Sequence, residues 1–314
     1  MQWPTDAPAT GYLNPDYVKA LSEFGQPIEL TSSRGWALRR AIDGGPECDA
    51  IGGYPFLACQ DWTGLAADLE QLRGDLVSFA CTPDPFGNYA LSDLESLFPD
   101  CMHHFKDHFI ADLSLPPERI ISRHHRKYAE RAFKKVEVEF STVPYGYLEE
   151  WLTIFGTAVR QFGVTGIRAY SRAAFSRHLA LPGAIMSLAR HRGKLVAAHV
   201  QMLHGETAYA HLASQTEDAY HLGAAYALYH AEIHYYAGKV RWIDWGGGVG
   251  VSVHDRGLSA FKRGWSTGTR PAYFCGRIFD RDRYRELARA REIALGAGTS
   301  LAPYFPAYRE GEFA

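Results

Sequence analysis

The sequence has few of the features that mark several broad classes of protein. Five of its 314 residues are cysteines, none in a CxxC pair: Cys48, Cys59, Cys81, Cys101 and Cys275. Scattered thiols of this kind fit a reduced protein better than disulfides, a zinc site or a nucleophilic cysteine. The formal net charge is only −2. This argues against a protein that coats nucleic acid through its overall charge, but leaves a local basic patch open.

Long apolar runs are also missing. No window approaches the roughly 18 apolar residues of a membrane span, and Met1–Asp6 lacks the basic start and apolar core of a signal peptide. We therefore expect a cytoplasmic protein without a membrane span. What the sequence does have is apolar material: 46% hydrophobic and 13% aromatic residues can fill packed cores. One large domain and two smaller ones are both open, and the length favours two.

The first half predicts short strands and loops between Cys48 and Asn88, with a helix around Gly64–Leu72. A strand at Phe109–Leu113 is followed by one long basic helix. That helix is expected to start after Ser114 and to carry Arg119, Arg123, Arg126, Lys127, Arg131, Lys134 and Lys135. Val136–Phe140 then alternates as a half-exposed strand does.

The second half is more regular. Helices are predicted at 147–162 and 171–179. Three antiparallel strands are then expected at 184–189, 195–203 and 207–214, joined by turns that contain glycine. A helix at 221–237, a strand at 240–245, a short helix at 258–262, a strand at 271–279 and a C-terminal helix at 281–293 complete the pattern.

Four local motifs stand out within residues 100–280. They are the basic run Arg123–Val136, the strand Tyr209–Ser214, the strand end Asp244-Trp245-Gly246-Gly247, and Gly257–Trp265. Together they resemble the Fem-type aminoacyltransferases, a branch of the GNAT superfamily. The last motif is similar to the family signature Gly-Leu/Ile-x-x-Phe-Lys-x-x-Phe, with Trp265 in place of the second Phe. The resemblance implies an α+β GNAT-like fold of mixed, mostly antiparallel sheets flanked by helices. It also implies two lobes, a diverged one at 1–140 and one carrying the acyl-transfer site at 141–314.

The same resemblance implies an enzyme that moves an aminoacyl or acyl group to a primary amine. Lys262 matches the signature lysine and is expected to offset charge that develops on the carbonyl oxygen. An ordinary surface lysine lying over Phe261 is the alternative. Asp244 ends a strand at a glycine turn, where it can orient the amine or simply cap the loop.

Candidates for the general base are His199 and His211, which lie on neighbouring predicted strands and could share a face. Whether they do depends on the strand register. Tyr209, Ser214 and Phe261 are expected to line the substrate site. His230 and His234 are one helical turn apart but have no evident third ligand, so no metal is expected.

The acyl donor is less defined by the sequence. Tyr220–Ala225 fits the coenzyme A loop Gln/Arg-x-x-Gly-x-Gly/Ala only at Gly223 and Ala225, because Tyr220 replaces the first residue. His221, Gly223 and Ala225 could still bind phosphate at a helix start, or could serve close packing. No tightly bound cofactor is expected. Aminoacyl-tRNA is preferred as the donor co-substrate because this loop is degenerate, and an acyl-CoA-dependent N-acyltransferase is the alternative.

Arg123, Arg126 and Lys127 are the predicted contacts for a tRNA acceptor end or another phosphate-bearing substrate. A solvated basic helix is the alternative. A GNAT-shaped binding protein without catalysis is a third reading of the whole chain. The identity of the acceptor amine and the oligomeric state are not predicted by the sequence.

Overall fold

The computed structural model describes residues 9–43, 45–248, 255–295 and 304–312, and the chain forms two compact units. The larger unit comprises Met1–Tyr17, Lys106–Val164 and Arg168–Pro271, and the smaller unit comprises Val18–Phe105, Thr165–Ile167 and Ala272–Ala314. Both units are therefore discontinuous in sequence, whereas a single boundary at residue 140 was expected. The segment before residue 140 joins the larger unit because its basic helix packs against a helix that follows residue 220.

Five strands of the smaller unit lie in the order β1-β2-β3-β4-β11. Their bounds are Gln26–Leu30 (β1), Gly35–Ala41 (β2), Cys48–Gly52 (β3), Ser78–Cys81 (β4) and Gly268–Ile278 (β11, which begins in the larger unit). Only β3 and β4 run parallel, and the other neighbours are antiparallel. The helical segments are η2 (Trp62–Gly64), α2 (Leu65–Gln71), η3 (Leu72–Gly74), α3 (Leu91–Leu97), α11 (Arg281–Leu295) and η6 (Ala307–Arg309).

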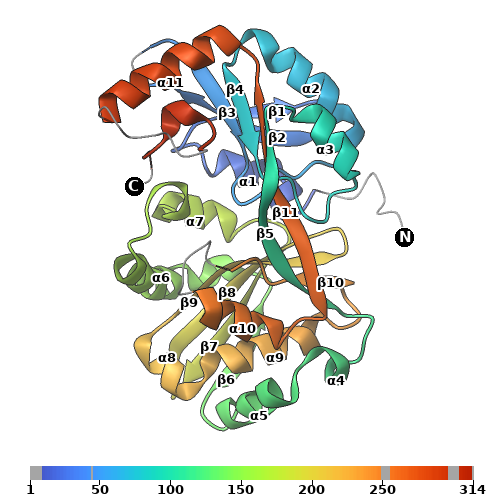
Figure 1. Cartoon of the computed structure of the whole chain (residues 1–314). Coiled ribbons are helices and arrows are strands. Elements are labelled where there is room, and N and C mark those ends of the chain that lie inside the picture. The colour runs from blue at the N-terminus through green and yellow to red at the C-terminus, as the bar shows by residue number, and fades with distance from the viewer. Residues whose placement is uncertain (1–8, 44, 249–254, 296–303, 313–314) are drawn as a thin grey trace. The chain divides into compact units, whose positions relative to one another are not determined.

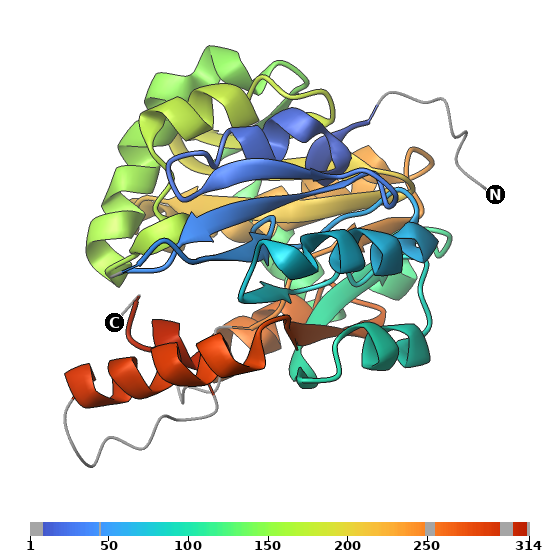
Figure 2. The same cartoon turned by 90° about the horizontal axis from the view of Figure 1, so that it is seen from above.

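The smaller unit has apolar contacts on both sides of these strands. Leu65 and Leu69 of α2 and Leu94 of α3 belong to one buried cluster with Phe79 of β4. Tyr308 joins a separate cluster that also holds side chains of α11. Figures 1 and 2 show α2 and α3 on one side of β3 and β4, and α11 on the other.

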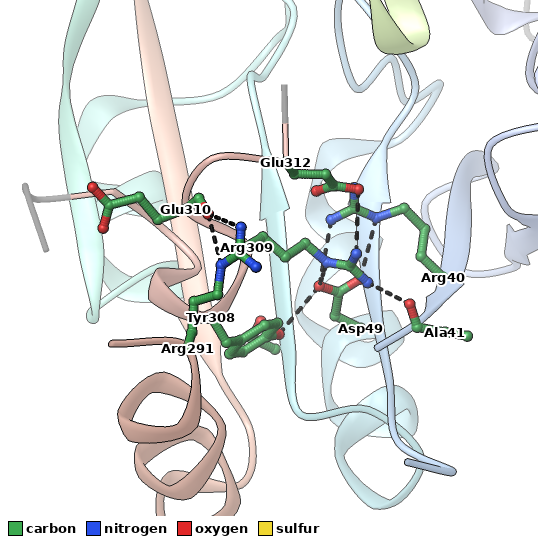
Figure 3. A network of polar contacts seen from close by, with 9 residues as sticks. Arg40, Ala41, Asp49, Arg291, Tyr308, Arg309, Glu310 and Glu312 are labelled. Carbon is green, nitrogen blue, oxygen red and sulfur yellow. Dashed lines mark hydrogen bonds and ion pairs between the residues drawn. The ribbon is translucent and has the colours of Figure 1, made fainter. Parts of the chain in front are cut away.

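A buried carboxylate joins the C-terminal segment to this unit (Figure 3). Asp49 of β3 is 1% exposed and accepts hydrogen bonds from both Arg40 and Arg309. The hydroxyl of Tyr308 also donates to Asp49, at 3.2 Å. Arg40 in turn binds Glu312 at 3.2 Å. Because two guanidinium groups share one buried carboxylate, the segment around η6 is held by charge as well as by packing.

The larger unit has the strand order β5-β10-β9-β8-β7-β6, with β10 and β9 parallel and the other neighbours antiparallel. The bounds are Cys101–Asp112 (β5, which begins in the smaller unit), Glu137–Ser141 (β6), Ala184–His191 (β7), Lys194–His204 (β8), Thr207–Gln215 (β9) and Trp242–Asp244 (β10).

Helices cover both faces of this sheet. They are η1 (Gly11–Leu13), α4 (Pro117–Ile120), α5 (Arg123–Ala132), η4 (Pro144–Tyr147), α6 (Leu148–Phe162), α7 (Arg172–His178), α8 (Glu217–Leu222), α9 (Ala224–Tyr236) and α10 (Asp255–Arg263). Residues of both units form α1 (Pro15–Lys19) and η5 (Gly166–Arg168). Figure 1 shows α6 and α7 on one side of β7–β9, and α9 with α5 on the other.

Two predicted helices need correction. The long basic helix is two helices, α4 and α5, because Ile121 and the N-cap Ser122 are extended. The helix expected at 221–237 begins earlier, at Glu217, and is broken by Gly223, whose φ of +73° is left-handed. Strands β1 and β2 were not predicted. Among the described residues, no helix has the length and apolar character needed to span a bilayer.

We predict that Asp49→Asn lowers the free energy of unfolding by about 3 kcal/mol, because Arg40 and Arg309 lose the buried carboxylate that they share and keep only the partly exposed Glu312. Urea denaturation of the full chain measures the change. Asp282→Asn is the control: its partner is Arg285, the two side chains are 86% and 75% exposed, and such pairs contribute about 0–1 kcal/mol. Equal losses in the two variants would contradict a specific role for Asp49.

Candidate acyl-transfer site

The sequence-predicted site lies where two parallel strands of the larger unit part. Strand β10 pairs with β9 at only three positions, the last being Asp244 opposite Tyr209. Beyond that pair β9 continues to Gln215, whereas the segment that follows β10 turns at Gly246, which has a φ of +73°. Glycine adopts a left-handed φ without steric cost, so the turn explains why Gly246 stands at this strand end.

Asp244 organises that turn. Its side chain is 1% exposed and accepts from the backbone N–H of Gly246 at 2.7 Å. His108 of β5 donates from Nδ1 to the same carboxylate, at 2.8 and 3.0 Å to the two oxygens. A buried carboxylate needs such donors. Asp244 therefore caps the loop, which was one of its two expected roles, and it also binds His108, which was not expected.

Lys262 of α10 is only 9% exposed, so it is not a solvated surface lysine. Its Nζ donates to the carbonyl oxygen of Gly247 at 2.6 Å. A Cβ atom added to Gly246 would lie 3.6 Å from the same Nζ. The ammonium group therefore lies directly beside the glycine turn that Asp244 holds.

Phe261, the residue before Lys262 in α10, is held by aromatic packing. Phe261 is half-buried and contacts the rings of His125, Tyr226, Tyr229 and Trp265. Its carbonyl oxygen also accepts from His125 Nε2 at 3.0 Å. Phe261 is thus a packing residue that fixes the helix from which Lys262 projects.

A second lysine, Lys106 of β5, reaches the same turn. A Cβ atom added to Gly247 would lie 2.6 Å from Lys106 Cδ, so the stem of this lysine crosses the glycine. Burial lowers the pKa of Lys106, and the neighbouring Asp244 partly offsets this. Neither Lys106 nor His108 was a sequence candidate. Both residues precede the strand predicted at 109–113, and Asp244 is 136 residues from His108, so no sequence pattern indicated that they meet.

Tyr209 and His211 of β9 lie in a cluster of rings. The hydroxyl of Tyr12 lies 3.0 Å from His211 Nδ1, and the Tyr12 ring contacts Tyr209 edge-on at 5.4 Å between centroids. Tyr17, Tyr170 and His178 also contact the His211 ring. Burial, with a smaller contribution from His178, holds the pKa of His211 well below its usual value.

His199 does not share this environment. Its Nδ1 lies 2.8 Å from the carboxylate of Glu232 on α9, and its ring contacts Tyr229 of the same helix. Ser187 and Gln201 donate to the same oxygen of Glu232. A β-bulge explains the separation: Val200 pairs with Leu212 and Gln201 with Ala210, so His211 is an extra residue. The two histidines therefore contact different helices and do not form a pair.

Ser214 is buried, and its hydroxyl donates to the carbonyl of Ile154 on α6 at 3.0 Å. The basic-helix residues differ among themselves. Arg123 and Lys127 are exposed on α5, whereas Arg126 is half-buried and donates to the carbonyl oxygen of Glu118. Only the first two therefore present free surface charge.

The expected phosphate loop has a different geometry from the one predicted. The helix that follows β9 starts at Glu217 and Asp218, whose two carboxylates lie in its first turn. His221 is exposed in the last turn of α8, and its carbonyl accepts from Lys135. Gly223 and Ala225 lie at the break between α8 and α9, where Gly223 approaches Ala132 of α5. Acidic residues at a helix start oppose the binding of a diphosphate.

Part of the chain matches a known protein family. Residues 119–263 match a family model described as an acetyltransferase (GNAT) domain. The described residues contain no group of three or more His, Cys, Asp or Glu side chains suited to a metal ion. No protein with a curated description matches the sequence.

Several solved structures share the fold. The crystal structure of FemX has 13% identity and a TM-score of 0.65, over 87% of this chain and 93% of that chain. The C-terminal domain of a candidate lysylphosphatidylglycerol synthetase from Agrobacterium fabrum has 15% identity and a TM-score of 0.62, over 89% and 91%. The structure of L-PGS from Bacillus licheniformis has 12% identity and a TM-score of 0.58, over 86% and 94%.

At such low identities these structural likenesses establish the fold, whereas the family model identifies the domain. The α+β fold class and the Fem-like resemblance inferred from the sequence are both confirmed. Residues 119–263 thus match a GNAT-type acetyltransferase domain, within a chain that has the fold of FemX.

Proposed function

We propose that this protein transfers an aminoacyl group from aminoacyl-tRNA to a primary amine of a small molecule or peptide. The observation that carries the proposal is the buried ammonium of Lys262, held at the glycine turn beside Asp244. In the reaction the amine nitrogen bonds to the ester carbonyl carbon, and the ester C–O bond breaks. One amine proton is lost, and the released ribose hydroxyl takes up a proton.

Each group at the turn has a proposed role in this step. Lys262 offsets the negative charge that develops on the carbonyl oxygen, in a site that water reaches poorly. Asp244 positions Lys262 through the turn and orients His108, and we propose that the Asp244–His108 pair receives the proton of the amine. We do not propose His199 as the base, because its Nδ1 is hydrogen-bonded to Glu232 of α9.

Two observations favour an aminoacyl ester over acyl-CoA as the donor. The carboxylates of Glu217 and Asp218 lie in the first turn of the helix that follows β9, where they would repel a diphosphate. Lysylphosphatidylglycerol synthesis, the named activity of a protein with this fold, also attaches an amino acid to another molecule. Aminoacyl-tRNA is a cytoplasmic donor, and the cytoplasmic location inferred from the sequence stays a prediction.

The full chain incubated with tRNA charged with labelled amino acids and a panel of primary amines is expected to form labelled amides. Parallel reactions with labelled acetyl-CoA test the other donor. Amide formed only from acetyl-CoA would replace the proposal with an acyl-CoA-dependent N-acyltransferase. Binding of a donor without turnover would favour a GNAT-shaped binding protein.

We predict that Lys262→Ala lowers kcat by about 100-fold with little change in KM, because removing one stabilising group for an oxyanion costs about 10²–10³ in kcat. Steady-state transfer kinetics measure the effect. Lys194→Ala, at the exposed first residue of β8, is the control and should leave both constants unchanged. Full activity of Lys262→Ala would remove Lys262 from the site.

We also predict that Arg123→Glu/Lys127→Glu weakens the binding of aminoacyl-tRNA about tenfold at about 0.1 M salt, because these exposed α5 cations would contact phosphates. The slope of log Kd against log salt should fall by about 2. Arg285→Glu/Arg289→Glu on α11 reverses the same number of charges as a control. Equal effects of the two double variants would mean that α5 is only a solvated helix.

A further inference from the structure

Two histidines of the larger unit each have one buried ring nitrogen without a hydrogen-bond partner among the described residues. They are Nδ1 of His178 on α7 and Nε2 of His211 on β9. Their rings are perpendicular, with centroids 5.9 Å apart. Buried polar atoms almost always have partners, so two neighbouring exceptions call for an explanation in function.

The tautomer of His178 follows from its contacts. Its Nε2 lies 3.1 Å from the backbone carbonyl oxygen of Tyr17. A carbonyl can only accept, so Nε2 carries the hydrogen. Burial lowers the pKa of His178 to about 4, so the ring is neutral near pH 7. Nδ1 of His178 therefore presents a lone pair.

The tautomer of His211 follows from its contact with Tyr12. The hydroxyl of Tyr12 donates to Nδ1, at 3.0 Å, when Nδ1 is unprotonated. With Nδ1 accepting from Tyr12, the single hydrogen of the neutral imidazole is on Nε2. Among the described residues, four titratable groups contact the His211 ring. They come from η1, α1, α7 and the segment before α7, and are Tyr12, Tyr17, His178 and Tyr170. None of them supplies a negative charge near neutral pH that would hold an imidazolium.

The position of His211 connects this ring to the acyl-transfer site. His211 is the extra residue of the β9 bulge, and bulges commonly re-aim a side chain next to an active site. It lies two residues beyond Tyr209, the last β9 residue that pairs with β10. Asp244, directly opposite Tyr209, leads into the turn that holds Lys262. His211 therefore borders the point where the two strands part.

We propose that His211 is a neutral hydrogen-bond donor for the carbonyl oxygen of the transferred acyl group, and that Tyr12 is the positioning residue that keeps the ring in this tautomer. The inference rests on the proposed function and adds a donor to it. Nε2–H stabilises the oxyanion without giving up its proton, as a preorganised donor in a dry site does. His211 is then not the general base, because its remaining lone pair is occupied by the hydroxyl of Tyr12.

Nitrogen-15 NMR of the full chain tests the ring state without any substrate. Two-bond ¹H–¹⁵N spectra of histidine-labelled protein should show His211 protonated at Nε2, unprotonated at Nδ1, and unchanged from about pH 8 to about pH 5. Tyr12→Phe should give a mixture of tautomers. Tyr17→Phe is the matched control, since it keeps the carbonyl that binds His178 and should leave the His211 signals in place. A wild-type ring protonated at Nδ1 would overturn the proposal.

Transfer kinetics test the role of the donor. His211→Gln retains an N–H group and should keep kcat within about tenfold, whereas His211→Leu should lower kcat by about 100-fold with little change in KM. Equal loss in both variants, or a kcat for His211→Leu within about threefold of wild type, would overturn the donor role. Wild-type protein that transfers from no donor would instead refute the proposed function, and the NMR result would still decide the ring state.

Discussion

The carboxylate of Asp244 is the interaction on which the site depends. A buried charge is tolerated only where donors surround it, and here the donors come from β5 and from the turn after β10. The Gly246 N–H fixes the turn, and the next carbonyl oxygen receives Lys262 from α10. One side chain thus connects three elements that are far apart in sequence. Removing its charge would loosen His108 and the turn together, so effects of substitutions at these positions should not be additive.

Much of the fold could be read from local sequence, and much of the site could not. Strands β7–β9 alternate clearly and are joined by glycine turns, so their bounds follow from the residues between 184 and 215. Strands β1 and β2 contain Pro27 and the charged pair Arg39-Arg40, and Arg40 is buried only because Asp49 is opposite it. Lys262 and Asp244 were found through motifs. His108 has no motif, and the face of His211 depends on a bulge that adds one residue, which no alternation pattern reveals.

The larger unit places two different polar groups against different helices. Beneath α9, Glu232 is fully buried and one of its oxygens lies within hydrogen-bond distance of His199, Ser187 and Gln201. Around His211 the partners are tyrosines and a second neutral imidazole. The first arrangement anchors α9 to the sheet through hydrogen bonds to one carboxylate. The second surrounds a ring with uncharged partners beside the strand at which the reaction is proposed, so one sheet holds two polar groups of different character.

The contact between Tyr12 and His211 spans 199 positions of the chain. Tyr12 is synthesised long before β9, so this contact cannot form until Val18–Phe105 of the smaller unit and most of the larger unit have been made. Closing so long a loop is entropically costly and slow relative to the formation of local turns. The ring cluster is therefore expected to be among the last parts of this unit to form, and the enzyme would acquire its complete site only at the end of folding.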